Sequence, residues 1–107
     1  MTSSIVKINR TSGSIGRPSV APGPSGGTYF AEGSDSTGIA HIARIDSLGA
    51  LVWTKEITIS AATTANGVTP TIHSSSDHLA VVLRYFETAG AVYKASVVLY
   101  LADGRLG

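Results

Sequence analysis

The chain has 107 residues, with 8 Lys and Arg against 7 Asp and Glu, a formal net charge of +1 and no cysteine. This length predicts one domain, or a piece of one, and excludes a multidomain enzyme. The absence of cysteine excludes disulfide scaffolds, thiolate zinc sites, iron–sulfur centres and cysteine nucleophiles.

Charged residues make up only 14% of the chain, against about 25% in typical globular proteins. A surface with so little charge repels its neighbours weakly, so we expect contacts with other protein subunits, in a homo-oligomer or a larger assembly. The basic residues form no stripe and the few aromatic residues form no stacking platform. Nucleic acid is therefore not an expected partner.

The longest apolar runs cover residues 79–83 and 97–102, far fewer than the roughly 20 residues of a membrane-spanning helix. We therefore expect no membrane insertion. The first eight residues alternate polar and apolar side chains and do not lead into an apolar signal-peptide core. This start predicts that the chain as given does not use that secretory route.

Short strands separated by turns are predicted in the N-terminal half. Ile5–Ile8 opens an extended segment, and residues 16–27 hold three prolines and four glycines. This composition predicts a Pro/Gly-rich connector, a loop or an extended stretch, and excludes a helix or a central strand. Strand composition follows at Thr28–Glu32 and at Ile39–Ile45, with a turn cluster over residues 33–38 between them.

The C-terminal half continues the pattern from a strand at Leu51–Ile59. Asn66-Gly67 is the best tight-turn signal and predicts a hairpin between residues 57–64 and Val68–Ile72, the latter an edge strand because of Pro70. Two more strands are predicted at 79–86 and 92–101, with turns at 73–78 and 102–104. No window has convincing helical periodicity, so the predicted fold class is all-β with short antiparallel strands.

Three segments superpose on a glycine that is followed two places later by an aliphatic residue: Ser4–Ile15, His41–Leu51 and Ser96–Leu106. A second superposition sets Thr28–Gly33 against Leu79–Arg84. The unit is strand, loop, strand, glycine turn and strand, and it recurs at about 35 to 55 residues, the range of propeller blades.

The segments Tyr29–Gly33 and Ala43–Lys55, which include Gly49 and Trp53, resemble the bacterial and phage β-propeller repeats whose blades carry a K-L-D-x-x-G-x-x-x-W-x-K core. Only Trp53 matches the tryptophan that recurs in each blade of that family. The resemblance implies propeller-blade-like repeats, in scaffolds or ligand platforms without a shared catalytic residue. A small β-sandwich is the alternative, because it uses the same short antiparallel strands and glycine turns.

A propeller needs four or more blades, and this chain holds fewer than two complete ones. The expectation is therefore a single β domain over residues 1–107, or a fragment of a larger repeat domain, that completes its sheets through a neighbour. The resemblance and the composition favour a non-enzymatic structural module of a phage virion, of the tail, fibre or baseplate type. Its edge strands, such as Val68–Ile72 or Val92–Leu101, would pair with other subunits.

The alternative function is a carbohydrate or receptor-binding module, with a surface glycan stacked on Tyr29, Phe30 or Trp53. Flat aromatic faces suit sugar rings, although aromatic packing in a sheet core is the more common use of such side chains. A catalytic triad within Ser74–His78 is not expected, since contiguous turn residues point apart.

Metal and cofactor binding is not expected either. His41, His73 and His78 have no standard ligand spacing. Asp35, Asp46 and Asp103 lie in glycine-containing turns, where a carboxylate accepts hydrogen bonds from backbone N–H groups. We therefore expect no enzyme activity and no cofactor.

Overall fold

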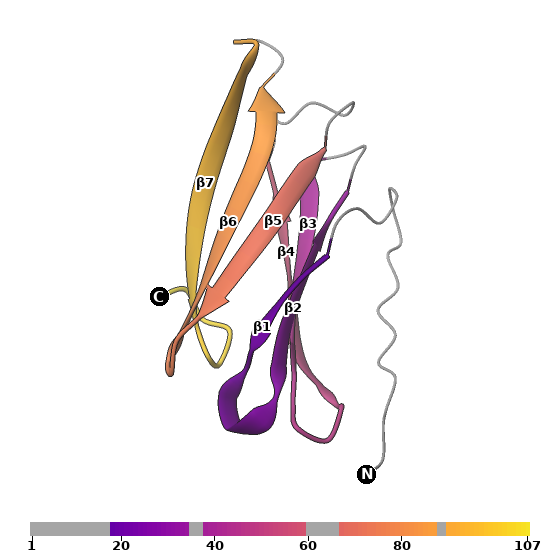
Figure 1. Ribbon diagram of the computed structural model, residues 1–107, viewed down its shortest axis with the longest axis vertical. Helices are drawn as coiled ribbons and strands as arrows, with labels where there is room; N and C mark the ends of the chain where they lie inside the picture. Colours follow the sequence, from indigo (N-terminus) through magenta and orange to yellow (C-terminus); the bar gives the residue numbers. More distant parts are fainter. Residues whose placement is uncertain (1–17, 35–37, 60–66, 88–89) are drawn as a thin grey trace.

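The structure is a computed structural model that describes residues 18–34, 38–59, 67–87 and 90–107. This part of the chain is all-β, as predicted, and forms two antiparallel sheets, neither closed into a barrel (Figure 1). One sheet has four strands in chain order: β1 (Pro18–Pro22), β2 (Thr28–Gly33), β3 (Ile39–Ile45) and β4 (Leu51–Thr58). The other has three: β5 (Val68–Ser74), β6 (His78–Glu87) and β7 (Val92–Leu101).

The strands predicted from period-two alternation are present at nearly the predicted bounds. The connector is different, because Pro18–Pro22 within it is strand β1, followed by the short 3-10 turn η1 (Pro24–Gly26). The expectation of a loop or extended connector over residues 16–27 is thus only partly right. β1 tolerates its prolines because it is an edge strand, with β2 as its one neighbour in the sheet and Pro18 and Pro22 at its two ends.

The hairpin predicted between residues 57–64 and Val68–Ile72 is wrong in the described residues, because residues 57–58 end β4 of the first sheet, whereas Val68–Ile72 lies in β5 of the second. Residues 60–64 lie outside the described residues. β5 is an edge strand, as Pro70 predicted, but it lies beside β1 and β2 of the first sheet (Figure 1). The turn signal is local, whereas sheet membership depends on which apolar faces meet. Asn66 and the predicted strand at Ile5–Ile8 lie outside the described residues.

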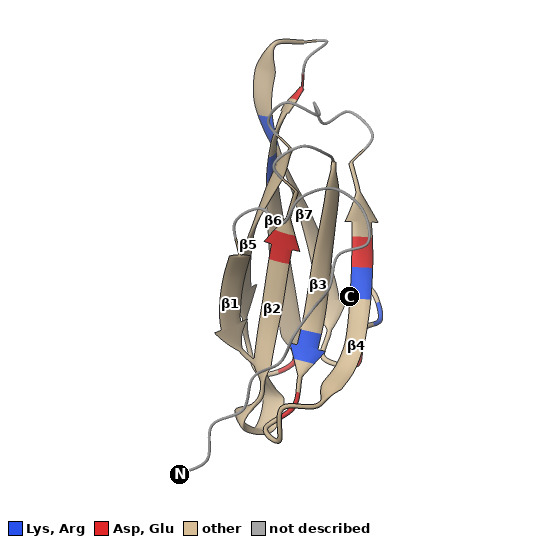
Figure 2. Cartoon of the chain, turned by 90° about the vertical axis from the view of Figure 1, so that its right-hand side faces the viewer, with Lys and Arg blue, Asp and Glu red and all other residues tan. Residues whose placement is uncertain are grey.

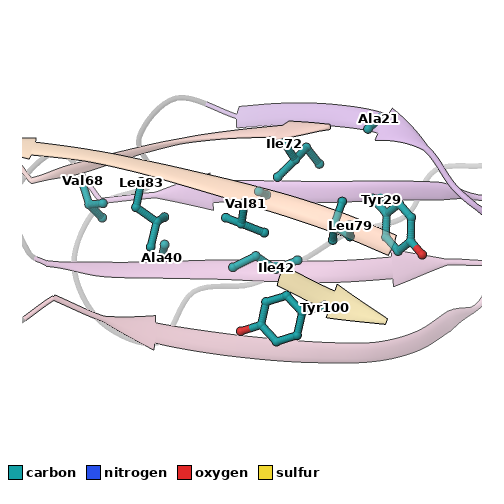
Figure 3. Packing of buried hydrophobic residues seen from close by; sticks show 11 residues of the cluster. Ala21, Tyr29, Ala40, Ile42, Val68, Ile72, Leu79, Val81, Leu83 and Tyr100 are labelled. Carbon is teal, nitrogen blue, oxygen red and sulfur yellow. The ribbon is translucent and has the colours of Figure 1, made fainter. Parts of the chain in front are cut away.

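The hydrophobic core lies between the two sheets and takes side chains from both (Figure 3). The four-stranded sheet contributes small residues beside two large ones: Ala21, Tyr29, Ala31, Ala40 and Ile42. The three-stranded sheet contributes mostly large aliphatic ones: Val68, Ile72, Leu79, Val81, Leu83 and Tyr100. Small side chains opposite large ones let the two layers interdigitate, so each sheet depends on the other to bury its inner face.

The sheets approach most closely where β2 ends beside the start of β5. The N–H of Val68 donates to the carbonyl oxygen of Ser34 at 2.9 Å, and Ser34 is fully buried. A Cβ on Gly33 would overlap the carbonyl oxygen of Val68 and press on the Pro70 ring. Glycine at position 33 therefore makes the close approach of the two backbones sterically allowed.

The strand registers match the second superposition made from the sequence. Thr28 pairs with Ile45 in the first sheet, and Leu79 pairs with Tyr100 in the second. At the other end of the same segments, Gly33 pairs with Ala40 and Arg84 pairs with Ala95. β2 and β3 therefore correspond residue by residue to β6 and β7.

The glycine turns after β3 and β7 have the same hydrogen bonds. After β3, Asp46 N–H donates to Ala50 O at 2.8 Å and Gly49 N–H to Asp46 O at 3.0 Å. After β7, the same bonds join Leu101 to Arg105 at 2.7 Å and Gly104 to Leu101 at 2.9 Å. Gly49 and Gly104 both have positive φ, at 86° and 92°. Beyond its turn, Leu106 forms a β-bridge with Tyr100, in the same way that Leu51 pairs with Ile45 in the first sheet. Leu106 therefore lies where a fourth strand of the second sheet would begin.

We predict that Gly33→Ala lowers the free energy of unfolding by about 2 kcal/mol or more, because the added methyl group forces the two backbones apart. Gly90→Ala is the matched control, since its Cβ would meet only ordinary contacts at 3.5 Å. Urea denaturation followed by circular dichroism measures both variants. Equal stability of the two variants would contradict this account of the sheet contact.

Candidate assembly interface

One face of the three-stranded sheet is covered by the first sheet, and the opposite face is not covered by any described strand. Alternate residues of β7 point to this outer face. They are Tyr93, Ala95, Val97 and Leu99, with exposed fractions of 83% for Tyr93, 62% for Val97 and 46% for Leu99. A strand with an exposed row of this kind is typical of a surface that packs against another protein.

β6 and β5 extend this outer face. Ala80, Val82, Arg84 and Phe86 of β6 lie opposite Leu99, Val97, Ala95 and Tyr93 of β7, respectively. β5 adds Thr69, Thr71 and His73, the register partners of Arg84, Val82 and Ala80. We call these eleven residues the outer face. Among them, only Arg84 carries a formal charge at neutral pH.

The β6–β7 hairpin extends past the end of the four-stranded sheet (Figure 1). The Phe86 and Tyr93 rings meet on this projecting part in an edge-on contact, with centroids 5.1 Å apart at 61°. On the opposite side of the hairpin, the Lys94 ammonium lies 2.6 Å from the Glu87 carboxylate, and this hydrogen bond raises the pKa of Lys94. The projecting end therefore has one apolar side and one charged side.

Both segments expected to be edge strands, Val68–Ile72 and Val92–Leu101, are edges of their sheet. The edge of β5 is engaged within the chain, because Ile72 N–H donates to Ser19 Oγ at 3.2 Å and Ser74 Oγ donates to Pro22 O at 2.6 Å. These two bonds tie β5 to β1 of the other sheet.

The edge of β7 is open over most of its length in the described part of the chain. Leu99 O accepts from Gly107 N–H at 2.9 Å and Leu101 N–H donates to Arg105 O, both on the side away from β6. Because the bonding direction alternates along an antiparallel strand, the N–H and C=O of Ala95 and Val97 point to the same side. They lie on the free edge of the sheet, where another strand could pair.

The three aromatic residues singled out from the sequence do not share one surface. Trp53 contacts two tyrosines between the sheets, with ring centroids 6.1 Å apart for Tyr29 and 6.0 Å apart for Tyr100. Tyr29 is buried in the core, as Figure 3 shows, and Trp53 is half-buried. Phe30 follows Tyr29 on the strand and points to the opposite face of the sheet. Glycan stacking on Phe30 or Trp53 stays a prediction.

Trp53 joins the first sheet to the turn after β7. Its Nε1–H donates to Ala102 O at 3.0 Å, and Arg44 Nη1–H donates to the same oxygen at 2.7 Å. Gly104 lies against the indole, and a Cβ there would come within 3.3 Å of the ring. The structure thus gives Trp53 a packing role between the sheets.

We predict that Trp53→Ala lowers the free energy of unfolding by about 3 kcal/mol, because it removes the indole that contacts both Tyr29 and Tyr100. Trp53→Phe keeps a ring there and loses the hydrogen bond to Ala102, so its loss should be about 1 kcal/mol. Chemical denaturation measures both. A Trp53→Ala protein as stable as the wild type that had lost binding to a glycan would instead make Trp53 a ligand-binding residue.

Burial raises the pKa of Tyr29 and Tyr100 above the ordinary value of 10.0, and the Arg44 charge offsets part of this rise at Tyr29. Above pH 10.0 the unfolded chain loses these phenolic protons while the folded chain keeps them. The unfolded state then binds fewer protons, so stability falls as the pH rises.

The double variant Tyr29→Phe/Tyr100→Phe should therefore lose less stability than the wild type between neutral and strongly alkaline pH. Tyr93→Phe, at an exposed ring, is the control and should follow the wild type. Denaturation midpoints measured across this pH range test the expectation. An equally steep fall in the double variant would refute it.

The titratable side chains form small hydrogen-bonded groups. His41 bonds Glu32 at 2.8 Å and Glu56 at 3.0 Å on the outer side of the four-stranded sheet. Asp46 accepts from the N–H of Leu48 and of Ala50, and Asp103 from that of Arg105 at 3.1 Å, as expected for turn carboxylates. Asp35 lies outside the described residues.

The Ser74–His78 segment does not bring a triad together. Ser74 Oγ donates to Pro22 O at 2.6 Å, whereas the exposed His78 and Asp77 bond each other at 3.0 Å. An open depression of about 830 Å³ lies nearby, between η1 and the end of β5, and is lined by both segments. In the described ranges, no group of three or more His, Asp or Glu side chains is arranged to hold a metal ion.

Comparison of the chain with protein-family models, curated proteins and solved structures gives no match. None of the helical structure in the described ranges is long and apolar enough to cross a membrane. The outer face and the β7 edge are therefore the candidate functional surfaces of the described chain.

Proposed function

We propose that the chain is a non-enzymatic structural module of a larger assembly, which acts through β-sheet contacts between subunits. The observation that carries this proposal is the free edge of β7, where the Ala95 and Val97 backbone groups face away from β6. A partner strand would bond to these groups through its own main chain, a mode of recognition that needs little side-chain specificity. β7 is ten residues long, longer than the common strand of about 5 to 6 residues, and its edge is open up to Val97 in the described part of the chain.

The low charge of the chain supports this role. Charged side chains are 14% of the residues, and Figure 2 shows how few of them lie along the strands of the four-stranded sheet. Proteins commonly use charged side chains to keep an exposed edge from pairing with another strand. β7 carries a single charge, on Lys94, and that charge is paired with Glu87.

For the finer fold we propose that the two sheets are consecutive propeller-blade-like units. Each is an up-and-down meander, as a blade is. The matched registers and the matched glycine turns support a repeated unit, with Leu106 at the start of a fourth strand in the second. We propose that such a module is a component of a phage virion, of the tail, fibre or baseplate type.

We predict that Ala95→Pro weakens self-association at least about tenfold. Proline removes the N–H that faces the free edge and breaks no bond to β6. Ala95→Ser is the matched control, because it keeps the N–H and nearly the same size. Sedimentation velocity over a concentration series measures association, and circular dichroism checks that each variant is folded.

A folded wild-type chain that stays monomeric over the series would overturn the proposed function. Association that is equal in the two variants would exclude the β7 edge as the contact.

A further inference from the structure

Corresponding residues of the two sheets point in opposite directions relative to the core. Ile42 of β3 lies in the core, and its register equivalent in β7 is Val97, which is exposed on the outer face. The same holds for the core residues Tyr29 and Ala31, whose equivalents Ala80 and Val82 lie on the outer face.

The reverse correspondence holds as well. Val81 and Ile72 fill the core from the second sheet, and their equivalents in the first sheet are Phe30 and Val20. These two face away from the core, and Val20 is 66% exposed. A two-fold arrangement would bury corresponding residues on both sheets. Here the front of one sheet packs on the back of the next.

This arrangement is a head-to-tail contact inside one chain, and such a contact can repeat. The outer face of the second sheet corresponds to the buried inner face of the first, and it has no described sheet against it. The opposite side of the first sheet, with Val20 and Phe30, corresponds to the core-facing side of the second sheet. It is therefore the surface that would cover the outer face. We call this side the back face.

We propose that the outer face binds the back face of a second copy of this chain, repeating the step that joins the two sheets. This inference rests on the proposed function, names the partner and adds a contact through the sheet faces to the one at the β7 edge. If each sheet is one blade of a propeller, four to eight sheets close a ring. Because each copy supplies two sheets, two to four copies would complete it.

Charge complementarity supports this partner. Arg84 is the formal charge of the outer face. The back face carries the exposed carboxylate of Glu56, which bonds His41, and the buried carboxylate of Glu32, which bonds the same ring. Repeating the internal step places Arg84 beside Pro18 of the second copy, the register partner of Glu32. Arg84 stands where the internal contact has Gly33. The contact between copies is therefore wider at this point, and the added space takes the Arg84 side chain.

The test uses introduced cysteines, because the chain has none of its own. Within the chain, Ser19 Oγ lies 3.2 Å from the Ile72 nitrogen. Ser19 corresponds to Thr71 and Ile72 corresponds to Val20, so the repeated contact places Thr71 of one copy beside Val20 of the next. We expect a mixture of the Thr71→Cys and Val20→Cys proteins to form a disulfide-linked heterodimer under mild oxidation. Neither variant alone should cross-link.

A Thr71→Cys homodimer would indicate that two outer faces meet, and it would overturn the head-to-tail contact. Absence of the heterodimer while the cysteine-free wild type still associates would also overturn it, and the proposed function would stand. A monomeric wild type would overturn both the head-to-tail contact and the proposed function. Circular dichroism of each variant confirms folding before oxidation.

Charge reversal gives a second measurement. Arg84→Glu should weaken self-association at least about tenfold, because it reverses the charge that the outer face presents to the acidic back face. Arg105→Glu makes the same change of charge in the exposed turn after β7, outside the outer face and the open part of the β7 edge, and it should associate as the wild type does. Equal weakening by both substitutions would contradict the proposed contact.

Discussion

The whole structure depends on the burial of one face of each sheet against the other. Neither meander has a second covering layer among the described strands, so the core formed by Ile42, Leu83 and their neighbours exists only where the sheets meet. Gly33 allows the backbones to approach, and the bond from Val68 to Ser34 fixes their relative position. The Trp53 indole and the Arg44 guanidinium attach the far side of the contact to the turn after β7.

The direction in which the sheets stack connects this core to the proposed assembly. Because the front of the first sheet packs on the back of the second, the outer face, which is equivalent to the buried front of the first sheet, has no described sheet against it. An apolar row with Val97 and Leu99 therefore remains on the outer face after folding. The free edge of β7 adds unpaired backbone groups beside that row. A second copy packed head-to-tail would cover the apolar row by the same physical means that forms the core.

The sequence predicts most of the strands because their signal is local. Alternation in β3 and β4, and the glycine turns at Gly49 and Gly104, depend on neighbouring residues alone. β1 was not predicted as a strand because its prolines are compatible with an edge, and only the pairing with β2 decides it. The partner of β5 is equally non-local. For the candidate site, the alternation of Tyr29 and Phe30 already separates them, whereas the bond from Ser19 that engages the β5 edge has no signal in the sequence.

The most direct test of the central claim is the solution mass of the purified chain by light scattering over a concentration series, with far-ultraviolet circular dichroism on the same peak. The account predicts a β-rich species of two to four copies whose fraction rises with concentration. A folded, β-rich monomer at every concentration would contradict it, because the outer face would then remain in water without a partner.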